Sequence, residues 1–338
     1  MLKKFERQEN IMMMEKLSQL LHENQGRYDK GLRLPQIPPI KSVWVVGQSS
    51  PTIKAKKKLV PAAELIMKSG FNEIINAYDY FFENPSDPEG VHQVRVRIRR
   101  FRAILAFFAP LFKAEHYQRQ QDRLRQMAGQ FGEVRQLDVL LEGIAEIEKE
   151  SVLEIDCFGE IKSFLKEKRE AAFDHLMVAL KTDDFALELL DIWIWKFNEP
   201  WDETASDLHG SIKDYTKKQI ANWHKKIRRS MKTLEIKDQQ AIHRVRIKSK
   251  KLRYVIEQLS SILDQKTRKS MNAFEKMQDD LGYYHDVFAN QLLLEQLVSA
   301  SDDNQLHYQA GIIIGWQMMA GNRKIKKFSE KVGTVVQK

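Results

Sequence analysis

The sequence predicts an all-α protein built from two pseudo-symmetric helical halves. From about residue 62 onward, apolar residues recur at the 3.6-residue spacing of amphipathic helices, and no segment shows a run of alternating strands. Only 15 Gly and 9 Pro interrupt the 338 residues. A basic segment of 11 residues occurs twice, with related residues around both copies, and this is typical of an internal repeat.

The composition favours a globular protein of a reducing compartment. A chain of 338 residues allows one large domain or two of about 150 residues, and its hydrophobic content of 43% can fill a core. Cys157 is the only cysteine, so no internal disulfide can form. No apolar run reaches the roughly 18 residues of a membrane span, and the first residues are too charged for a signal peptide. We therefore expect a cytoplasmic protein without a membrane partner.

Three regions follow one another along the chain. Residues 1–60 are predicted to be an N-terminal extension, with a polar helix over 1–34 and a Pro/Lys-rich linker that includes a short β-like run at 43–46. Residues 61–200 and 201–338 are the predicted first and second helical repeats. The periodicity predicts helices over 62–83, 87–109, 114–131, 134–150, 158–181, 184–197, 203–234, 239–263, 265–281, 284–300 and 303–328.

The repeat extends beyond its basic residues. Residues 92–102 and 243–253 are 151 positions apart, and Asp87 and Asp238 precede them at the same offset, where each suits a helix N-cap. Farther along, each half has an amphipathic helix that ends in a glycine, Gly132 or Gly282. Each half is thus predicted to contain a capped basic helix, a hairpin and this second helix.

Four residues of each basic helix share one side, and we call these two sets the first and second stripes. The first stripe is His92, Arg95, Arg99 and Arg102, and the second is His243, Arg246, Lys250 and Arg253. On a helical wheel each stripe lies beside an apolar arc that must face a core. Four further cations, expected to be more solvated, lie on other faces of the helices: Arg97, Arg100, Lys248 and Lys251.

The charge pattern of the stripes indicates a bound anion. Solvated helix faces usually mix charge signs, because opposite charges at i,i+4 stabilise a helix and like charges repel. Neither 11-residue segment contains an acid, and together they hold 11 of the chain's Lys and Arg. The retention of such repulsion in both copies therefore favours a site for an anion over an ordinary solvated face.

The anion is expected to be a phosphate polymer. Guanidinium groups match phosphate oxygens with paired donors, and lysine adds a point charge. Each stripe extends over about 15 Å, at roughly 1.5 Å of rise per residue, so two stripes could line one continuous groove for a linear polyanion. The two histidines could donate to phosphate when neutral, or add charge when protonated near pH 6.5.

These motifs resemble those of a known family, the CHAD domain (conserved histidine α-helical domain). Its paired signature is matched by His-x-x-Arg-x-x-x-Arg-Arg-x-Arg at 92–102 and by His-x-x-Arg-x-x-x-Lys-Lys-x-Arg-Tyr at 243–254. Its glycine turn is similar to 131–139 and 281–287, although Gln136 stands in place of the usual acid and His285 in place of a small polar residue. The resemblance covers about residues 60–330.

The resemblance implies two halves like four-helix bundles around a basic central cavity that binds inorganic polyphosphate, without catalysis by this domain and without a cofactor. The binding residues predicted from the stripes and the signature are His92, Arg95, Arg99, Arg100, Arg102, His243, Arg246, Lys250, Lys251 and Arg253. Arg119 and Lys269 correspond across the repeat and are secondary candidates. Relatives often carry a fused CYTH-type domain, for which the first 55 residues are too short, so we expect a stand-alone member that could associate with polyphosphate granules.

Nucleic acid is the main alternative ligand, since basic stripes suit any phosphate chain. Readout of bases would require exposed aromatic or amide side chains beside the cations. The apolar pattern places Phe101 in the core, and Tyr254 has Ala103 as its counterpart in the first half. The pattern thus disfavours nucleic acid without excluding it.

A metal-dependent phosphohydrolase is a weaker alternative. His285 and Asp286 are adjacent, but a metal centre requires further ligands at suitable spacing. His92 and His243 lie among cations that repel a metal ion, so we expect no catalytic residue and no protein-ligated metal. A divalent cation could still bridge bound phosphates.

Three further patterns have structural or secondary roles. The tryptophans at 193, 195, 201 and 223 are expected in the core or in bundle contacts, and Gly311-x-x-x-Gly315 is expected in a buried, closely packed helix rather than a membrane span. A helix before the second stripe could extend the groove with Lys217, Lys218, Lys225, Lys226, Arg228 and Arg229.

Overall fold

The computed structural model describes residues 53–54, 57–150, 158–181, 184–197, 200–235, 238–264, 282–283 and 286–336. Within these ranges the regular structure is helical, apart from two isolated β-bridges, so the all-α prediction is confirmed. The helices are α2 (Leu59–Glu83), α3 (Pro88–Phe108), η2 (Ala109–Leu111), α4 (Ala114–Gln130), α5 (Gly132–Glu150), α6 (Gly159–Lys181), α7 (Asp184–Phe197), α8 (Ile212–Lys232), α9 (Gln239–Gln258) and α11 (Asn304–Val336). Residues 286–298 are also helical. The elements predicted at 1–34, 43–46 and 265–281 lie outside the described residues.

The two basic helices begin where the sequence predicts. At the start of α3, the Asp87 carboxylate accepts a hydrogen bond from the backbone N–H of Glu89 at 2.9 Å. At the start of α9, the Asp238 carboxylate accepts one from the N–H of Ala241 at 2.8 Å. Each aspartate satisfies a donor that the first turn leaves unpaired, so both N-caps are confirmed.

The predicted start of the helix at 203 is wrong, because α8 begins only at Ile212. Residues 200–211 instead connect two distant parts of the chain. The backbone N–H of Asp202 donates to the carbonyl of Leu111 at 2.8 Å, and the N–H of Leu59 donates to the carbonyl of Gly210 at 3.0 Å. These long-range bonds use backbone groups that a helix would have paired locally. The spacing of apolar residues along the chain cannot predict such bonds.

Residues from both predicted repeats form one hydrophobic core. Tyr215 of α8 stacks on Phe108 of α3 with ring centroids 5.8 Å apart, and its hydroxyl donates to the carbonyl of Phe107 at 2.8 Å. Gly70 of α2 lies where a Cβ would be only 3.0 Å from Phe101 of α3, so glycine permits the close approach of these helices. The core thus fixes α3 between α2 and the elements of the second repeat.

The expected roles of the tryptophans are confirmed, whereas that of the paired glycines is not. Trp193, Trp195 and Trp201 are buried, and Trp223 is half-buried against the core. Gly311 and Gly315 are exposed, and a Cβ added at either would meet open space, because α11 buries a different face. No helix among the described residues is long and apolar enough to cross a membrane.

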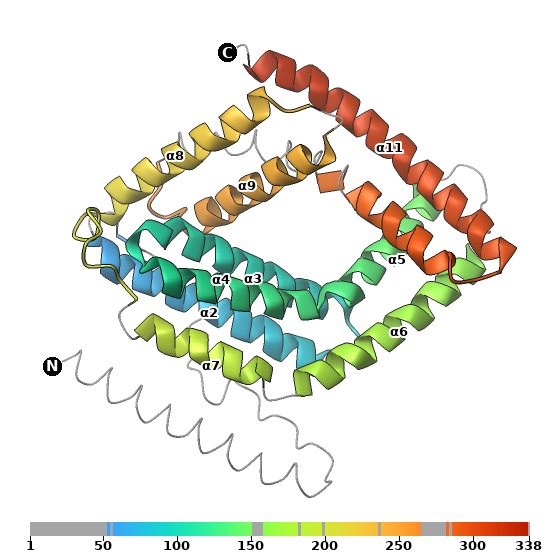
Figure 1. Ribbon diagram of the computed structural model, residues 1–338, viewed down its shortest axis with the longest axis horizontal. Helices are drawn as coiled ribbons and strands as arrows, with labels where there is room; N and C mark the ends of the chain where they lie inside the picture. The colour runs from blue at the N-terminus through green and yellow to red at the C-terminus, as the bar shows by residue number, and fades with distance from the viewer. Residues whose placement is uncertain are drawn as a thin grey trace, which may run out of the picture.

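Figure 1 shows how this arrangement positions the basic helices. The helices α3 and α9 lie toward the interior and pack against each other, with α2 and α4 beside α3. The helices α8 and α11 run along the outer edge, and α8 packs on α9. Two segments that are far apart in the sequence thereby become neighbours.

Candidate functional site

All eight residues of the two stripes are half-buried on helices that touch each other. Their apolar neighbours determine this placement, because Val94, Ile98 and Phe101 of α3 and Val245 and Leu252 of α9 are buried in the core. A stripe beside such an arc lies at the margin of the core instead of in open solvent. The cations therefore lose part of their hydration on folding. This loss increases the free energy that would be gained by binding an anion.

Arg95 is held by the C-terminal end of α4. Its Nη1 donates to the carbonyl of Ala128 at 2.5 Å, and a Cβ at Gly132 would lie 3.3 Å from the same nitrogen. In the second half, a Cβ at Gly282 would lie 3.7 Å from Nε of Arg246. The glycine of each turn therefore lies close to the first arginine of its stripe, a contact that the sequence alone does not reveal.

The two first arginines differ in their partners. Arg246 forms an ion pair with Asp286 at 2.9 Å. The residue that corresponds to Asp286 in the first half is Gln136, which is exposed. The acid of the glycine turn thus neutralises the first arginine of the second stripe, whereas Arg95 bonds to a backbone carbonyl instead.

Two stripe residues pair with acids that lie outside the two 11-residue segments. Besides Arg246, Arg253 approaches Glu257 at 3.2 Å, one turn along α9. In contrast, neither Arg99 nor Lys250 forms an ion pair with any residue in the described ranges. The Nε atom of Arg99 is buried and also has no hydrogen-bond partner there. Arg99 and Lys250 are therefore the stripe cations best placed to accept an external anion.

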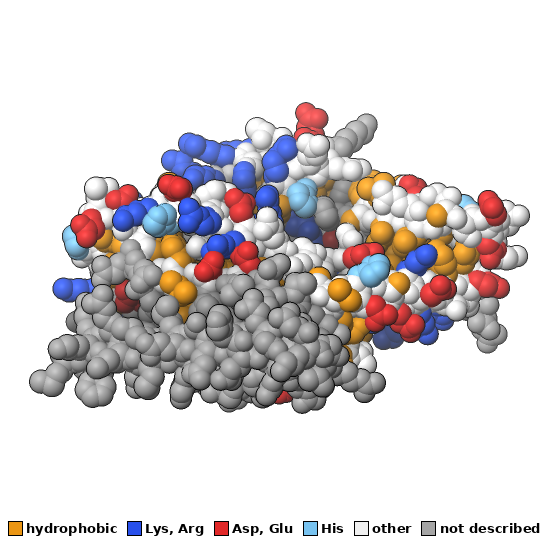
Figure 2. Space-filling view, turned by 60° about the horizontal axis from the view of Figure 1, so that its bottom comes forward, with side chains coloured by type: hydrophobic (Ala, Val, Ile, Leu, Met, Phe, Trp, Pro, Cys, Tyr) orange, Lys and Arg blue, Asp and Glu red, His pale blue; other side chains and the backbone are white. Residues whose placement is uncertain are grey.

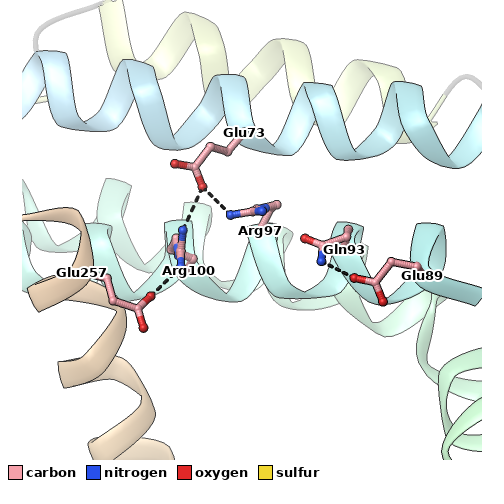
Figure 3. Close-up of polar contacts among 6 residues, drawn as sticks. All are labelled: Glu73, Glu89, Gln93, Arg97, Arg100 and Glu257. Atoms are coloured by element: carbon pink, nitrogen blue, oxygen red, sulfur yellow. Dashed lines mark hydrogen bonds and ion pairs between the residues drawn. The ribbon is translucent and has the colours of Figure 1, made fainter. Parts of the chain in front are cut away.

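Arg97 and Arg100 are not the solvated side chains that the helical wheel predicts. Both donate to Glu73 of α2, at 3.1 and 3.3 Å, and Arg100 also reaches Glu257 of α9 at 2.5 Å (Figure 3). The Arg100 guanidinium lies 5.7 Å from the centre of the Tyr254 ring. Arg100 thus joins three helices through ion pairs, so much of its donor capacity is used within the protein.

The counterparts of these arginines in the second half have fewer carboxylate partners. Lys248 is exposed and donates to the hydroxyl of Ser230 on α8 at 2.9 Å. Lys251 is half-buried, and its pKa is lowered by burial and by Arg102 across the contact between the helices. At these two positions the second half therefore leaves more positive charge unneutralised than the first.

The charges of the two stripes act on one another. Burial lowers the pKa of Lys250 to about 8, with repulsion from Arg246, Arg99 and Arg253 adding to the effect and Asp286 opposing it. Burial and the neighbouring Arg99 and Arg135 lower the pKa of Arg95 to about 10, so it stays charged at neutral pH. Cations from α3 and α9 thus share one partly dehydrated region, where an anion would relieve their repulsion.

The two histidines lie in different surroundings. Burial, followed by repulsion from Arg135, lowers the pKa of His92, so its ring is neutral at pH 7 and can donate a hydrogen bond. His243 lines a cavity of about 450 Å³ at the start of α9, together with Arg244 and the apolar residues Phe288 and Leu292. His92 therefore becomes protonated, and adds positive charge, only at a pH below the usual pKa of histidine.

Arg135 belongs to the site but is absent from the predicted site residues. It is half-buried, pairs with Glu142 at 2.8 Å, and repels the charges of His92 and Arg95. Its position three residues after Gly132 could have indicated it, since the glycine turn packs beside the stripe. The secondary candidate Arg119 is exposed and pairs with Glu115 at 3.6 Å, whereas Lys269 and His285 lie outside the described residues.

The weaker alternative of a metal centre receives no support from the described part of the chain. Asp286 pairs with Arg246, and no group of three or more His, Cys, Asp and Glu residues in that part could hold a metal ion. Cations surround this carboxylate, so its local field opposes the binding of a metal ion.

Comparisons with known proteins agree with the helical fold described above. The family model of the CHAD domain matches residues 74–295. A crystal structure of the CHAD domain from the plant Ricinus communis is similar over 83% of this chain and 96% of that chain, with 22% sequence identity and a TM-score of 0.68. PptA from Streptomyces chartreusis is similar over 81% of this chain and 99% of that chain, with 13% identity and a TM-score of 0.61. No curated protein matches the sequence.

Proposed function

The chain belongs to the CHAD domain family, and we propose that it binds inorganic polyphosphate along the stripes of α3 and α9. In this proposal the protein has two pseudo-symmetric halves, and the stripes line one groove between them. The stripe residues and Lys251 contact phosphate oxygens, whereas Arg100 mainly holds the helices together. The chain acts as a binding protein, without catalytic residues of its own, and could associate with polyphosphate granules.

One observation supports this proposal most strongly. Arg99 and Lys250 come from different repeats and lie close enough for Arg99 to lower the pKa of Lys250, yet neither has an ion pair within the described ranges. Half-buried cations that repel one another reduce stability unless an anion joins them. A polymer of phosphates supplies negative charge at regular intervals, and a divalent cation could bridge those phosphates that lie away from the stripes.

The proposal is tested by titrating the protein calorimetrically with polyphosphate and with single-stranded DNA at matched salt. We expect polyphosphate to bind more tightly, and its affinity to fall by about a thousandfold between roughly 50 and 200 mM salt, by analogy with nucleic acids. The double variant R95A/R99A should lose most of this affinity. The charge-matched control K149A/K166A, in exposed lysines of α5 and α6, should retain it. A flat salt response, or a preference for DNA that persists across the salt range, would refute the proposal.

A further inference from the structure

The outer face of α8 is a second concentration of positive charge, apart from the stripes. The helix contains eight Lys or Arg and one acid, Asp214, whose backbone and side chain are bonded to Ser211 at the N-cap. All eight cations are exposed, while Ile212, Tyr215 and Ile227 bury the opposite side. Figure 2 shows Lys and Arg gathered over the side of the molecule that carries α4 and α8, at the left in both views.

Most of these cations have no ion pair with the residues that the structure describes. Within the described residues, Lys218 is the only cation of α8 with an ion pair, to Asp207 at 2.7 Å. On a helical wheel, five others fall within an arc of about 120° and extend over about 22 Å along the helix axis. These five are Lys217, Lys225, Arg228, Arg229 and Lys232.

Stabilisation of the helix explains only part of this pattern. Arg229 and Lys232 lie in the last turn, where cations interact favourably with the helix dipole. Lys217, Lys225 and Arg228 lie farther from that end, and pairs of like charge at i,i+3 and i,i+4 destabilise a helix. A local structural role therefore leaves these three cations unexplained.

The two halves also differ in how they neutralise equivalent cations beside the stripes. In the first half, Glu73 of α2 neutralises Arg97. In the second half, α8 packs beside α9. Lys248, the counterpart of Arg97, donates a hydrogen bond to the hydroxyl of Ser230 on α8. A hydroxyl accepts a hydrogen bond without neutralising the ammonium, so Lys248 adds to the charge of α8.

The side chains on this face favour a flexible phosphate chain over other polyanions. Of the aromatic residues of α8, Tyr215 is buried and Trp223 is half-buried against the core, so the face offers little aromatic surface on which bases could stack. None of the exposed large hydrophobic residues among the described parts of the chain belongs to α8, so the face has nothing to insert into a lipid bilayer. Its exposed cations are therefore better suited to phosphate groups than to bases or acyl chains.

We propose that α8 and Lys248 bind the distal part of a long polyphosphate chain whose proximal part occupies the stripes, an inference that rests on the proposed function. A chain long enough to reach both surfaces binds the second one as an intramolecular step, at a high effective concentration. A short chain occupies the stripes alone. The outer face of α8 thereby makes the protein selective for long polyphosphate without any new contact at the stripes.

The test compares long chains with short chains of about 15 Å, the extent of one stripe. The variant K225Q/R228Q/K232Q removes three charges from α8, and K149Q/K166Q/R323Q removes three exposed charges from α5, α6 and α11. We expect the α8 variant to bind long chains about tenfold more weakly and short chains within about twofold of the unmodified protein, since only long chains use both surfaces. The control should match the unmodified protein for both lengths, and circular dichroism checks that all variants fold.

The possible results separate this inference from the proposed function. If short chains bind but long chains lose no more affinity than short ones in the α8 variant, the inference is wrong and the stripe site stands. If duplex DNA or vesicles rich in anionic lipid bind at saturating polyphosphate, and only the α8 variant abolishes that binding, the face has another partner and the inference again fails. If neither chain length binds the unmodified protein, the proposed function itself is refuted.

Discussion

At the scale of single residues, the stripes contain cations of two kinds. Arg99 and Lys250 lack an ion pair in the described part of the protein, whereas Arg246 and Arg253 pair with Asp286 and Glu257. Cations of the first kind add repulsion to the folded state. Cations of the second kind are partly neutralised by carboxylates of the folded protein. Substitutions that look equivalent in the sequence should therefore affect stability in different ways.

Arg99→Ala and Arg246→Ala should separate affinity from stability. Both are expected to weaken polyphosphate binding strongly. Arg99→Ala should leave the free energy of unfolding equal or higher, because it relieves repulsion, whereas Arg246→Ala should lower it by about 1–3 kcal/mol, because the ion pair between Arg246 and Asp286 is lost. Denaturant unfolding of both variants provides the measurement. Equal losses of stability in the two would contradict this division.

Lys250 should make binding sensitive to mildly alkaline pH. Its pKa of about 8 means that the free protein loses this charge as the pH rises above 8. Affinity should then fall by at most about tenfold per pH unit, since only the ammonium attracts phosphate. Lys250→Arg keeps its charge and should bind independently of pH between 7 and 9, as titrations at constant salt would show.

The stability of the free protein should respond in the opposite sense. The pKa of Lys250 is lower in the folded state than its ordinary value of 10.5, so the folded state binds fewer protons between pH 8 and 10.5. The cost of burying this charge is complete below pH 8 and disappears as the pH rises toward 10.5. Relative to Lys250→Gln, the unmodified protein should thus gain stability over that range. A difference that stays constant with pH would show that Lys250 titrates normally.

At the scale of elements, Glu73 and Glu257 fasten α3 to its neighbours. Glu73 holds Arg97 and Arg100 against α2, and Glu257 of α9 lies between Arg100 of the first repeat and Arg253 of the second. An external phosphate would have to compete with this carboxylate for the same two guanidinium groups. Glu257 therefore acts as an internal anion. It lowers the affinity for polyphosphate and stabilises the contact between α3 and α9.

Glu257→Gln should accordingly raise polyphosphate affinity while lowering the free energy of unfolding by about 1 kcal/mol, because the contact loses its charge. Glu188→Gln is a matched control, since Glu188 pairs with Arg123 at 3.2 Å on another face. The control should lose a similar stability at unchanged affinity. Calorimetric titration together with thermal unfolding measures both quantities, and a fall in the affinity of Glu257→Gln would show that the carboxylate positions the arginines for the ligand.

At the scale of the whole molecule, the continuous core and the contact between α3 and α9 make the stripes parts of one unit. Neutralising the first stripe with R95A/R99A/R102A should weaken binding to long chains by far more than twofold and leave one chain bound per protein. Two independent sites would instead halve the stoichiometry and leave the remaining affinity unchanged. Calorimetry with long polyphosphate distinguishes these results, and the second would exclude a shared site.

The sequence by itself determined the described helices other than the start of α8, the two aspartate caps, the buried arcs and the family. These features depend on neighbours within a turn or two, so the spacing of apolar residues and the chemistry of a cap record them directly. The repeat also indicated the stripes, because residues 151 positions apart occupy the same places relative to the apolar arcs of two similar helices.

Only the tertiary structure decided which cations have partners. Glu73 lies 24 residues from Arg97, Asp286 lies 40 residues from Arg246, and Glu257 lies 157 residues from Arg100. The helical wheel therefore presented Arg100 as a solvated cation, although it joins three helices. The irregular segment before α8 escaped prediction for the same reason, since its backbone bonds to η2 and α2. Charge interactions and long-range backbone bonds depend on distances in space. The periodicity of the sequence predicts which residues are close only within one helix.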